Sequence, residues 1–261
     1  MRGETRIPYF KFKESKLYYA QKNKQSKKGM CLVFIHGSGE SSEVWRNQLD
    51  ALNDNIELIA IDLPGHGKSE KMETLSMEVY IDVIRSLRQL LGKEKLIIAG
   101  HSLGGAIAQS FYFKYPNYVQ ALILCATGAK LRVNNFILNS LKNDFEAYLE
   151  SIPIAAFYRK TQQSIKTQYV NQTKKMDPLI VYTDFSICDQ FDTREKTPSI
   201  TVSTLIIVGE ADKLTPPKYS EFFEQHIEDA QLIVIEKAGH MVMLENPEKV
   251  NKKINNFVKS L

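Results

Sequence analysis

The sequence predicts an α/β fold with a doubly wound sheet, on the basis of two observations. Short apolar runs typical of strands recur along the chain, and helical patterns separate them. Most of these runs are continuously apolar rather than alternating, as expected for parallel strands covered on both faces: CLVFI, ELIAID, KLIIAG, ALILCA, TLIIVG and QLIVIE. The 261 residues, 43% of them hydrophobic, can form a single large α/β domain or one domain with an insertion.

The elements can be assigned in chain order. The first is an antiparallel hairpin of YFKFK and KLYYAQ, with its turn at Glu14 and Ser15. Helices are expected at 42–52, 77–91, 103–115 and 217–226, each after one of the apolar strands. A last helix begins with Asn246 as N-cap and Pro247 at its first position, and runs to the end of the chain.

Residues 129–197 interrupt the alternation of strands and helices. This segment has no strong strand and is rich in Asn, Lys and Gln. A structureless loop of this length is improbable inside a compact domain, so we expect a helical insertion between core segments 1–128 and 198–261. Its apolar residues have helical spacing: Phe136, Ile137, Leu141, Phe145, Tyr148, Leu149 and Ile152. Since it follows the sixth strand, the insertion should form a cap over the carboxyl ends of the strands, where such sheets bind ligands.

Composition and charge argue against several classes of protein. Lys and Arg number 34 against 30 Asp and Glu, and the one basic run, KNKQSKKG (22–29), reads as a solvated loop, so we expect no nucleic-acid partner. No apolar run approaches the roughly 18 residues of a membrane helix, and the N-terminus has no signal-peptide pattern. Cys31 and Cys125 lie in apolar strands without CxxC spacing, and Cys188 carries no signal. We expect a cytoplasmic protein without disulfides or membrane partners.

The stretch AGHSLGGA (99–106) places a serine between a buried strand and a helix. A serine at the tip of so sharp a turn takes strained backbone angles, and neighbouring side chains would collide there. Gly100 and Gly104 remove these collisions, so that the Ser102 hydroxyl stands free at a helix N-terminus, which favours developing negative charge. The pattern predicts Ser102 as a nucleophile.

A serine nucleophile needs a base and an acid that orients the base. His240, in KAGHMVMLENP, follows the last apolar strand and should emerge at the same sheet edge as Ser102. Asp212, in VGEADKLTPP, follows the penultimate apolar strand and reaches that edge as well. Glu210 is a rival, which we rank below Asp212 because Asp212 lies further into the loop. The predicted catalytic set is therefore Ser102, Asp212 and His240.

The other histidines fit structural roles. His226 belongs to a polar helix end and should face solvent, and His101 should point away from the adjacent serine. His36 and His66 occupy glycine-rich loops, whose shape they would hold by hydrogen bonds. Trp45, the single tryptophan, is expected to pack its helix against the core.

A second glycine-rich loop, in FIHGSGES, follows the strand CLVFI. Its glycines allow backbone N–H groups to turn toward the serine. The N–H groups of Ser38 and Leu103 are therefore predicted to form an oxyanion hole. Each such donor typically contributes about 100- to 1,000-fold in rate.

These segments together resemble the α/β-hydrolase family. FIHGSG, IAIDLPGHGKS, AGHSLGGA, LIIVGEADKLTPP and KAGHMVMLENP occur in the order and spacing of that family, over nearly the whole chain outside the insertion. The resemblance implies an eight-stranded, mostly parallel sheet with helices on both faces, a helical cap, no metal or other cofactor, and hydrolysis through an acyl-serine. It leaves the substrate open.

The serine narrows the choice within the family. It resembles that of esterases, lipases, lactonases, thioesterases, carbon–carbon bond hydrolases and acyltransferases. Carbon–carbon bond hydrolases usually show HGxGPG and arginines in the cap; here HGSGES lacks the proline, although Arg159 lies in the insertion.

We predict a carboxylic-ester hydrolase, monomeric or homodimeric, that acts on small molecules with small to medium acyl chains. The alternatives are the other activities on the same triad, and a non-enzymatic ligand sensor that retained the hydrolase shell.

Overall fold

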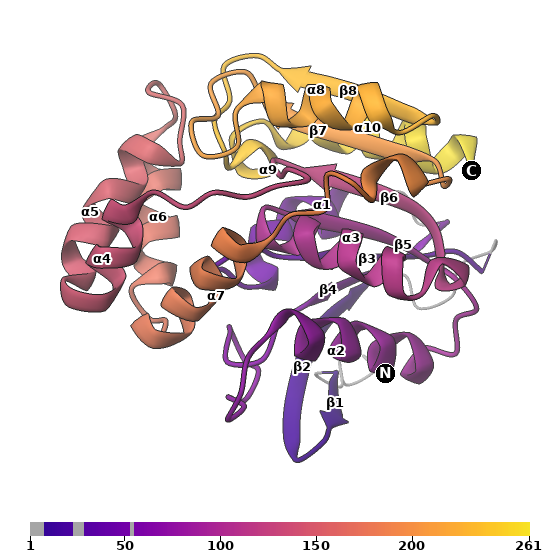
Figure 1. Ribbon diagram of the computed structural model, residues 1–261, viewed down its shortest axis with the longest axis horizontal. Coiled ribbons are helices and arrows are strands. Elements are labelled where there is room, and N and C mark those ends of the chain that lie inside the picture. The colour runs from indigo at the N-terminus through magenta and orange to yellow at the C-terminus, as the bar shows by residue number, and fades with distance from the viewer. Residues whose placement is uncertain (1–7, 23–28, 53–54) are drawn as a thin grey trace, which may run out of the picture.

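The computed structural model of the protein describes residues 8–22, 29–52 and 55–261. An eight-stranded sheet with the order β1-β2-β4-β3-β5-β6-β7-β8 runs through the molecule (Figure 1). Neighbouring strands from β4 to β8 pair in parallel, whereas β2 pairs antiparallel with β1 and with β4. This confirms the predicted eight-stranded, mostly parallel sheet. The strands are β1 (Tyr9–Phe12), β2 (Ser15–Lys22), β3 (Cys31–Ile35), β4 (Glu57–Ile61), β5 (Leu96–His101), β6 (Val119–Cys125), β7 (Thr204–Gly209) and β8 (Ala230–Ile235).

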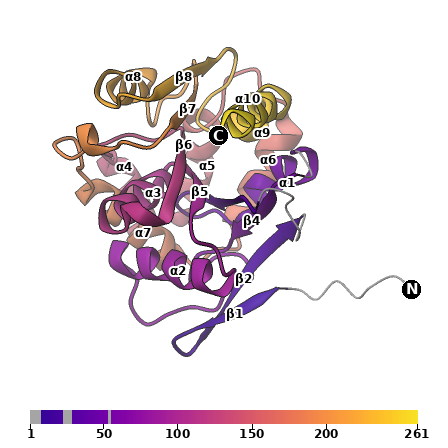
Figure 2. The same cartoon turned by 90° about the vertical axis from the view of Figure 1, so that its right-hand side faces the viewer.

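Helices cover both faces of the sheet (Figure 2). One face is packed by α2 (Met77–Leu90), α3 (Leu103–Lys114) and α8 (Pro217–His226). The other face is packed by the 3₁₀ helix Ser42–Trp45, α1 (Arg46–Ala51), α9 (Val242–Glu245) and α10 (Pro247–Ser260). Two further 3₁₀ turns, Pro116–Tyr118 and Thr197–Ser199, precede β6 and β7. Because the central strands are enclosed on both sides, β3, β4, β5 and β7 are buried along their whole length.

Four details differ from the prediction. The hairpin turn lies one residue earlier, since Phe12 pairs with Ser15 and Lys13 takes a φ of 52°. The predicted helix 42–52 begins as a 3₁₀ turn. Asn246 occupies the N-cap of α10, but its side chain forms no capping hydrogen bond. Strand β8 is half exposed, because it is an edge strand and only β7 pairs with it.

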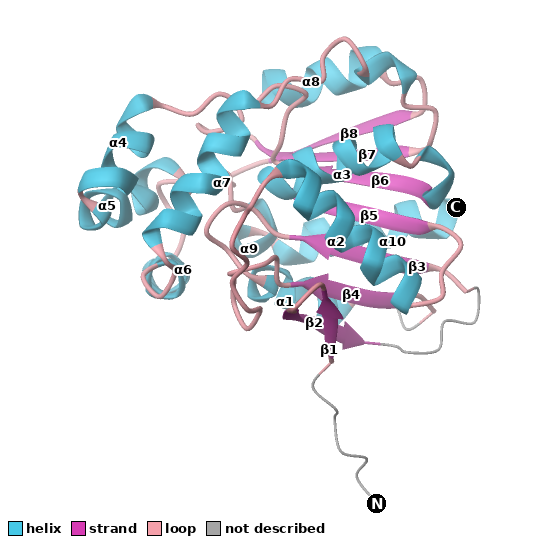
Figure 3. Ribbon diagram, turned by 60° about the horizontal axis from the view of Figure 1, so that its bottom comes forward, coloured by secondary structure: helices cyan, strands magenta, loops and turns pink. Residues whose placement is uncertain are grey.

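The segment between β6 and β7 is helical, as predicted. It contains α4 (Asn135–Asn143), α5 (Phe145–Ala155), α6 (Gln163–Thr173) and α7 (Pro178–Gln190). These helices gather at one end of the sheet (Figure 3). Leu141, Tyr148, Leu149 and Ile152 are buried there, whereas Phe136 is 52% exposed. The periodicity therefore identified the buried apolar residues of α4 and α5, and it did not extend to those of α6 and α7.

Two compositional expectations can be compared with the structure. All three cysteines are buried and free, and Cys31 and Cys125 lie in the central strands β3 and β6. Within the described ranges, no helix is both long and apolar enough to span a bilayer. Most of the basic run 22–29, namely residues 23–28, lies outside the described residues.

Candidate active site

Ser102 occupies the sharp turn between β5 and α3. Its backbone is strained, with φ 50° and ψ −115°, which a non-glycine residue rarely adopts. A Cβ atom at Gly100 would lie 2.1 Å from the Gly104 carbonyl oxygen, and one at Gly104 would lie 2.2 Å from that of Ile35. Both glycines are therefore required by close backbone approach, as the sequence indicated.

His240 and Asp212 meet at the same edge of the sheet. The Asp212 carboxylate lies 2.9 Å from Nδ1 of His240 and accepts hydrogen bonds from the N–H groups of Leu214 and Thr215. Thr215, which the sequence analysis did not identify, donates its hydroxyl to Asp212 over 2.8 Å and lies 3.1 Å from Nδ1 of His240. The rival Glu210 is exposed and instead accepts the Lys237 N–H, so Asp212 is the partner of the histidine.

Burial and charge shift the pKa values of this pair in opposite directions. Burial alone would lower the pKa of His240, but the Asp212 carboxylate outweighs this effect, so the pKa lies above its usual value of 6.5. Burial alone would raise the pKa of Asp212, but His240 and the Thr215 hydrogen bonds lower it overall. The pair is therefore suited to hold a proton on the imidazole.

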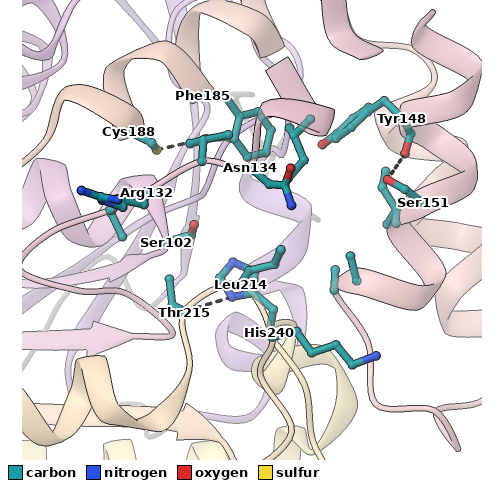
Figure 4. A pocket seen from close by; sticks show the side chains of 18 of the residues that line it. Ser102, Arg132, Asn134, Tyr148, Ser151, Phe185, Cys188, Leu214, Thr215 and His240 are labelled. Carbon is teal, nitrogen blue, oxygen red and sulfur yellow. Dashed lines mark hydrogen bonds between the residues drawn. The ribbon is translucent and has the colours of Figure 1, made fainter. Parts of the chain in front are cut away.

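Ser102 and His240 line one cavity, into which both side chains project (Figure 4). Among the described residues, the Ser102 hydroxyl forms no hydrogen bond with the imidazole, so this contact would have to form on substrate binding. Such contacts are often long in enzymes without substrate and tighten in the substrate complex. The cavity holds about 200 Å³. Its walls are mainly apolar and come largely from the insertion, including Ile137, Tyr148, Ile152 and Phe185.

The loop that carries Ser38 is held on both sides by buried carboxylates. The Gly37 N–H donates to Glu40 over 2.7 Å, and the Gly39 N–H donates to Asp184 over 3.2 Å. Neither the Ser38 N–H nor the Leu103 N–H has a protein acceptor within the ranges that the structure describes. Ser38 also lines the cavity, and Leu103 is the first residue of α3. Both predicted oxyanion donors are thus unpaired in the described ranges, and Ser38 lies at the cavity.

Glu40 connects this loop to His101 and to helix α6 of the insertion. Its carboxylate lies 3.0 Å from Nδ1 of His101 and accepts the Tyr169 hydroxyl of α6, also over 3.0 Å. The other ring nitrogen of His101 lies 3.1 Å from the carbonyl oxygen of His240. Burial alone would raise the pKa of Glu40, but His101 and the Gly37 N–H lower it to about 2, so the buried carboxylate is ionised.

Asp184, on α7, is a second buried carboxylate that the sequence did not identify. It lies 2.8 Å from Nε2 of His66 and accepts the Tyr80 hydroxyl over 2.6 Å, in addition to the Gly39 N–H. Burial alone would lower the pKa of His66, and the Asp184 charge raises it overall. Asp184 therefore joins the insertion to the core through three hydrogen bonds.

The remaining candidates lie where the sequence placed them. His36 contacts the carbonyl of Gly37 and accepts the Leu63 N–H, so it shapes its loop. His226 is exposed, and Trp45 is fully buried with its ring 4.8 Å from that of Phe34.

Other predicted features can also be placed. His101 does not line the cavity, because its ring is turned toward Glu40. Arg159 is exposed and does not line the cavity either. In the described part of the chain, no three histidine, cysteine or acidic side chains form an arrangement that could hold a metal ion.

Comparisons with known proteins agree with this fold. A family model described as the alpha/beta hydrolase fold matches residues 31–247. A thermophilic esterase of solved structure is 36% identical, with 97% of both chains covered and a TM-score of 0.85. The 3-oxoadipate enol-lactonase 1 of Acinetobacter baylyi is 28% identical over 88% of this chain and 89% of its own. The proline iminopeptidase PfmaB of Pestalotiopsis fici is 28% identical over 79% of this chain and 83% of its own. The chain belongs to the α/β-hydrolase family.

Proposed function

We propose that this protein is a serine hydrolase that cleaves carboxylic esters of small to medium acyl chain. The observation that carries the proposal is the Asp212–His240 pair, 2.9 Å apart, at the same cavity as the strained Ser102. An orienting acid, a base and a cavity-lining hydroxyl on a glycine-flanked turn together provide a nucleophile for acyl transfer. A relative 36% identical over nearly the whole chain is an esterase, which supports the choice of reaction.

In the first half of the reaction, Oγ of Ser102 attacks the ester carbonyl carbon while Nε2 of His240 takes the hydroxyl proton. The carbonyl oxygen becomes an oxyanion, which the N–H groups of Ser38 and Leu103 bind. Asp212 holds the imidazole in the tautomer that carries a proton on Nδ1, and stabilises the imidazolium. When the intermediate collapses, the alcohol leaves with the proton from His240, and the acyl group remains on Ser102.

In the second half, His240 removes a proton from water, which attacks the acyl-serine. The second intermediate binds the same two N–H groups, and its collapse returns the proton to Ser102 and releases the carboxylic acid. The proposed preference for small to medium esters follows from the cavity volume of about 200 Å³. Sites for drug-sized ligands are typically about 300–1,000 Å³.

The test is hydrolysis of p-nitrophenyl esters of increasing acyl length by the wild type and by Ser102→Ala. We expect the substitution to reduce kcat about a million-fold, as loss of a triad nucleophile does elsewhere, and to abolish labelling by phenylmethanesulfonyl fluoride. Ser199→Ala, at an exposed serine, is the matched control and should leave both unchanged.

Undiminished turnover by folded Ser102→Ala would overturn the assignment of the nucleophile. At most one slow turnover by the wild type would instead indicate a ligand sensor. Lactones and thioesters assayed beside the esters separate esterase from lactonase and thioesterase activity, and added alcohol reveals acyl transfer by formation of a new ester.

A further inference from the structure

A second cavity adjoins the one at Ser102, and Arg132 lines both. The second cavity holds about 280 Å³. We call it the cationic groove; its lining includes four cationic residues and two aromatic ones: Lys130, Arg132, Arg194, Lys218, Tyr219 and Phe222. Figure 4 shows the Arg132 side chain at the Ser102 side of the first cavity, with its guanidinium turned away from the centre. An extended ligand at Ser102 that passes Arg132 would enter this groove.

The charge in the groove is not balanced. Asp192 lies 2.7 Å from Nζ of Lys130 and 2.7 Å from the guanidinium of Arg194, so these two cations share one ion-paired carboxylate. In the ranges that the structure describes, Arg132 and Lys218 have no carboxylate within ion-pair distance. The nearby Asp189 accepts the Val133 N–H and forms no ion pair with Arg132. Two unpaired cations therefore face the same space.

The floor of the groove suits an organic anion. Tyr219 and Phe222 of α8 provide aromatic surface beside the charged side chains. Apolar walls with a few charged groups are characteristic of sites for small organic ligands, and the guanidinium of arginine matches a carboxylate with two parallel hydrogen bonds.

We propose that the preferred ester carries a second, ionised acidic group, which the cationic groove binds through Arg132 and Lys218. The inference rests on the proposed function and adds the chemical class of the substrate. The catalytic cavity holds the scissile carbonyl, and the groove holds the carboxylate at the end of the acyl or the alcohol arm. A neutral ester would lack this contact and be turned over less efficiently.

The test compares two pairs of substrates that differ in charge. Monomethyl glutarate and methyl valerate have acyl arms of equal length, one ending in a carboxylate; 4-acetoxybenzoate and 4-acetoxybenzamide differ in the alcohol arm. The readout is the ratio of kcat/KM for the anionic ester to that for its neutral partner, measured in wild type and variants. Differences in intrinsic reactivity cancel when the ratios are compared between proteins.

For at least one pair, we expect Arg132→Gln to lower this ratio about fivefold and Arg132→Gln with Lys218→Gln to lower it about tenfold. The effect should lie mainly in the KM of the anionic ester, so that kcat/KM falls less for the neutral ester than for its anionic partner. Raising the salt from about 0.1 M to about 1 M shortens the Debye length from about 10 Å to about 3 Å and should lower the wild-type ratio. Lys160→Gln, at an exposed lysine of the insertion outside both cavities, is the matched control.

An unchanged ratio for both pairs in the double variant would overturn the inference. In that case hydrolysis of the neutral esters and its loss in Ser102→Ala would still support the proposed esterase. Failure of the wild type to hydrolyse any ester would contradict the proposed function itself. Circular dichroism and melting temperature of each variant show that the fold is retained.

Discussion

The Asp184 carboxylate accepts a hydrogen bond from the Gly39 N–H over 3.2 Å, so a helix of the insertion holds the loop next to Ser38. Glu40 holds the N–H group on the other side of Ser38 in the same way, over 2.7 Å. With both neighbours engaged, the peptide of Ser38 has a fixed orientation. The insertion thus forms cavity walls and also constrains the proposed oxyanion hole.

We expect Asp184→Asn to lower kcat about tenfold with little change in KM, because a misaligned oxyanion donor weakens transition-state binding more than substrate binding. The asparagine side chain has one acceptor oxygen, whereas the two oxygens of the Asp184 carboxylate together accept three hydrogen bonds. Steady-state kinetics with a p-nitrophenyl ester checks this expectation. Asp189→Asn, an exposed position on the same helix, is the control. A change in KM alone would show that Asp184 shapes the pocket and not the oxyanion loop.

The His66–Asp184 pair also predicts a pH dependence of stability. The pKa of His66 is raised in the folded protein, so protonation of His66 stabilises the fold below its unfolded value of about 6.5. That contribution is lost as the pH rises through the folded pKa. The stability difference between wild type and Asp184→Asn should therefore be larger at pH 6 than at pH 9, as urea unfolding at both values can show. A difference that grows with pH would contradict this reading.

The rate should follow the deprotonation of His240. Because the Asp212 carboxylate raises the pKa of His240 overall, the acid limb of kcat/KM should have its midpoint above the reference value of about 6.5. Asp212→Asn should reduce kcat about 10⁴-fold and move the midpoint of the residual activity downward. A pH–rate profile from pH 5 to 9 tests both. An unchanged midpoint in Asp212→Asn would show that the acid limb does not arise from the Asp212–His240 pair.

Gly100→Ala should prevent stable folding, since its Cβ would lie 2.1 Å from the backbone oxygen of Gly104. The atoms nearest to this Cβ all belong to the backbone of Gly104 and Gly105, so no flexible side chain could move away. Gly92→Ala is the comparison, because nothing lies within 4 Å of that Cβ and only the φ of 62° is unfavourable there. We expect Gly92→Ala to cost about 1–2 kcal/mol and to leave a measurable melting transition. Equal stability of the two variants would show that the turn relaxes.

The catalytic candidates were predictable because each follows an apolar strand. Parallel strands end at the same edge of a sheet, so Ser102, Asp212 and His240 could be placed together without knowledge of any side-chain contact. The loop of Ser38 could be placed at this edge in the same way, because it follows the strand CLVFI. The parallel pairing and the two covered faces followed from the continuous apolar runs, and the number of strands followed from the family resemblance.

Asp184 could not be predicted in this way. Its contact with Gly39 spans 145 positions of sequence, and helical periodicity identifies a packed face but not the residue that it meets. Glu40 lies within the glycine-rich loop FIHGSGES. Its burial nevertheless depends on His101 and on Tyr169 of α6, which come from remote parts of the chain. Thr215 was similarly missed, although it lies three residues after Asp212.

The two ends of the insertion return to neighbouring points of the core. Lys130 and Asp192 form an antiparallel bridge and an ion pair, and the Thr193 N–H donates to the carbonyl of Ala129. A segment whose entry and exit adjoin can be exchanged without stretching the sheet beneath it. The chain therefore offers a natural splice point for chimaeras, in which the helices of another α/β-hydrolase are grafted between positions 130 and 192 with an acceptor for the Gly39 N–H kept in the place of Asp184.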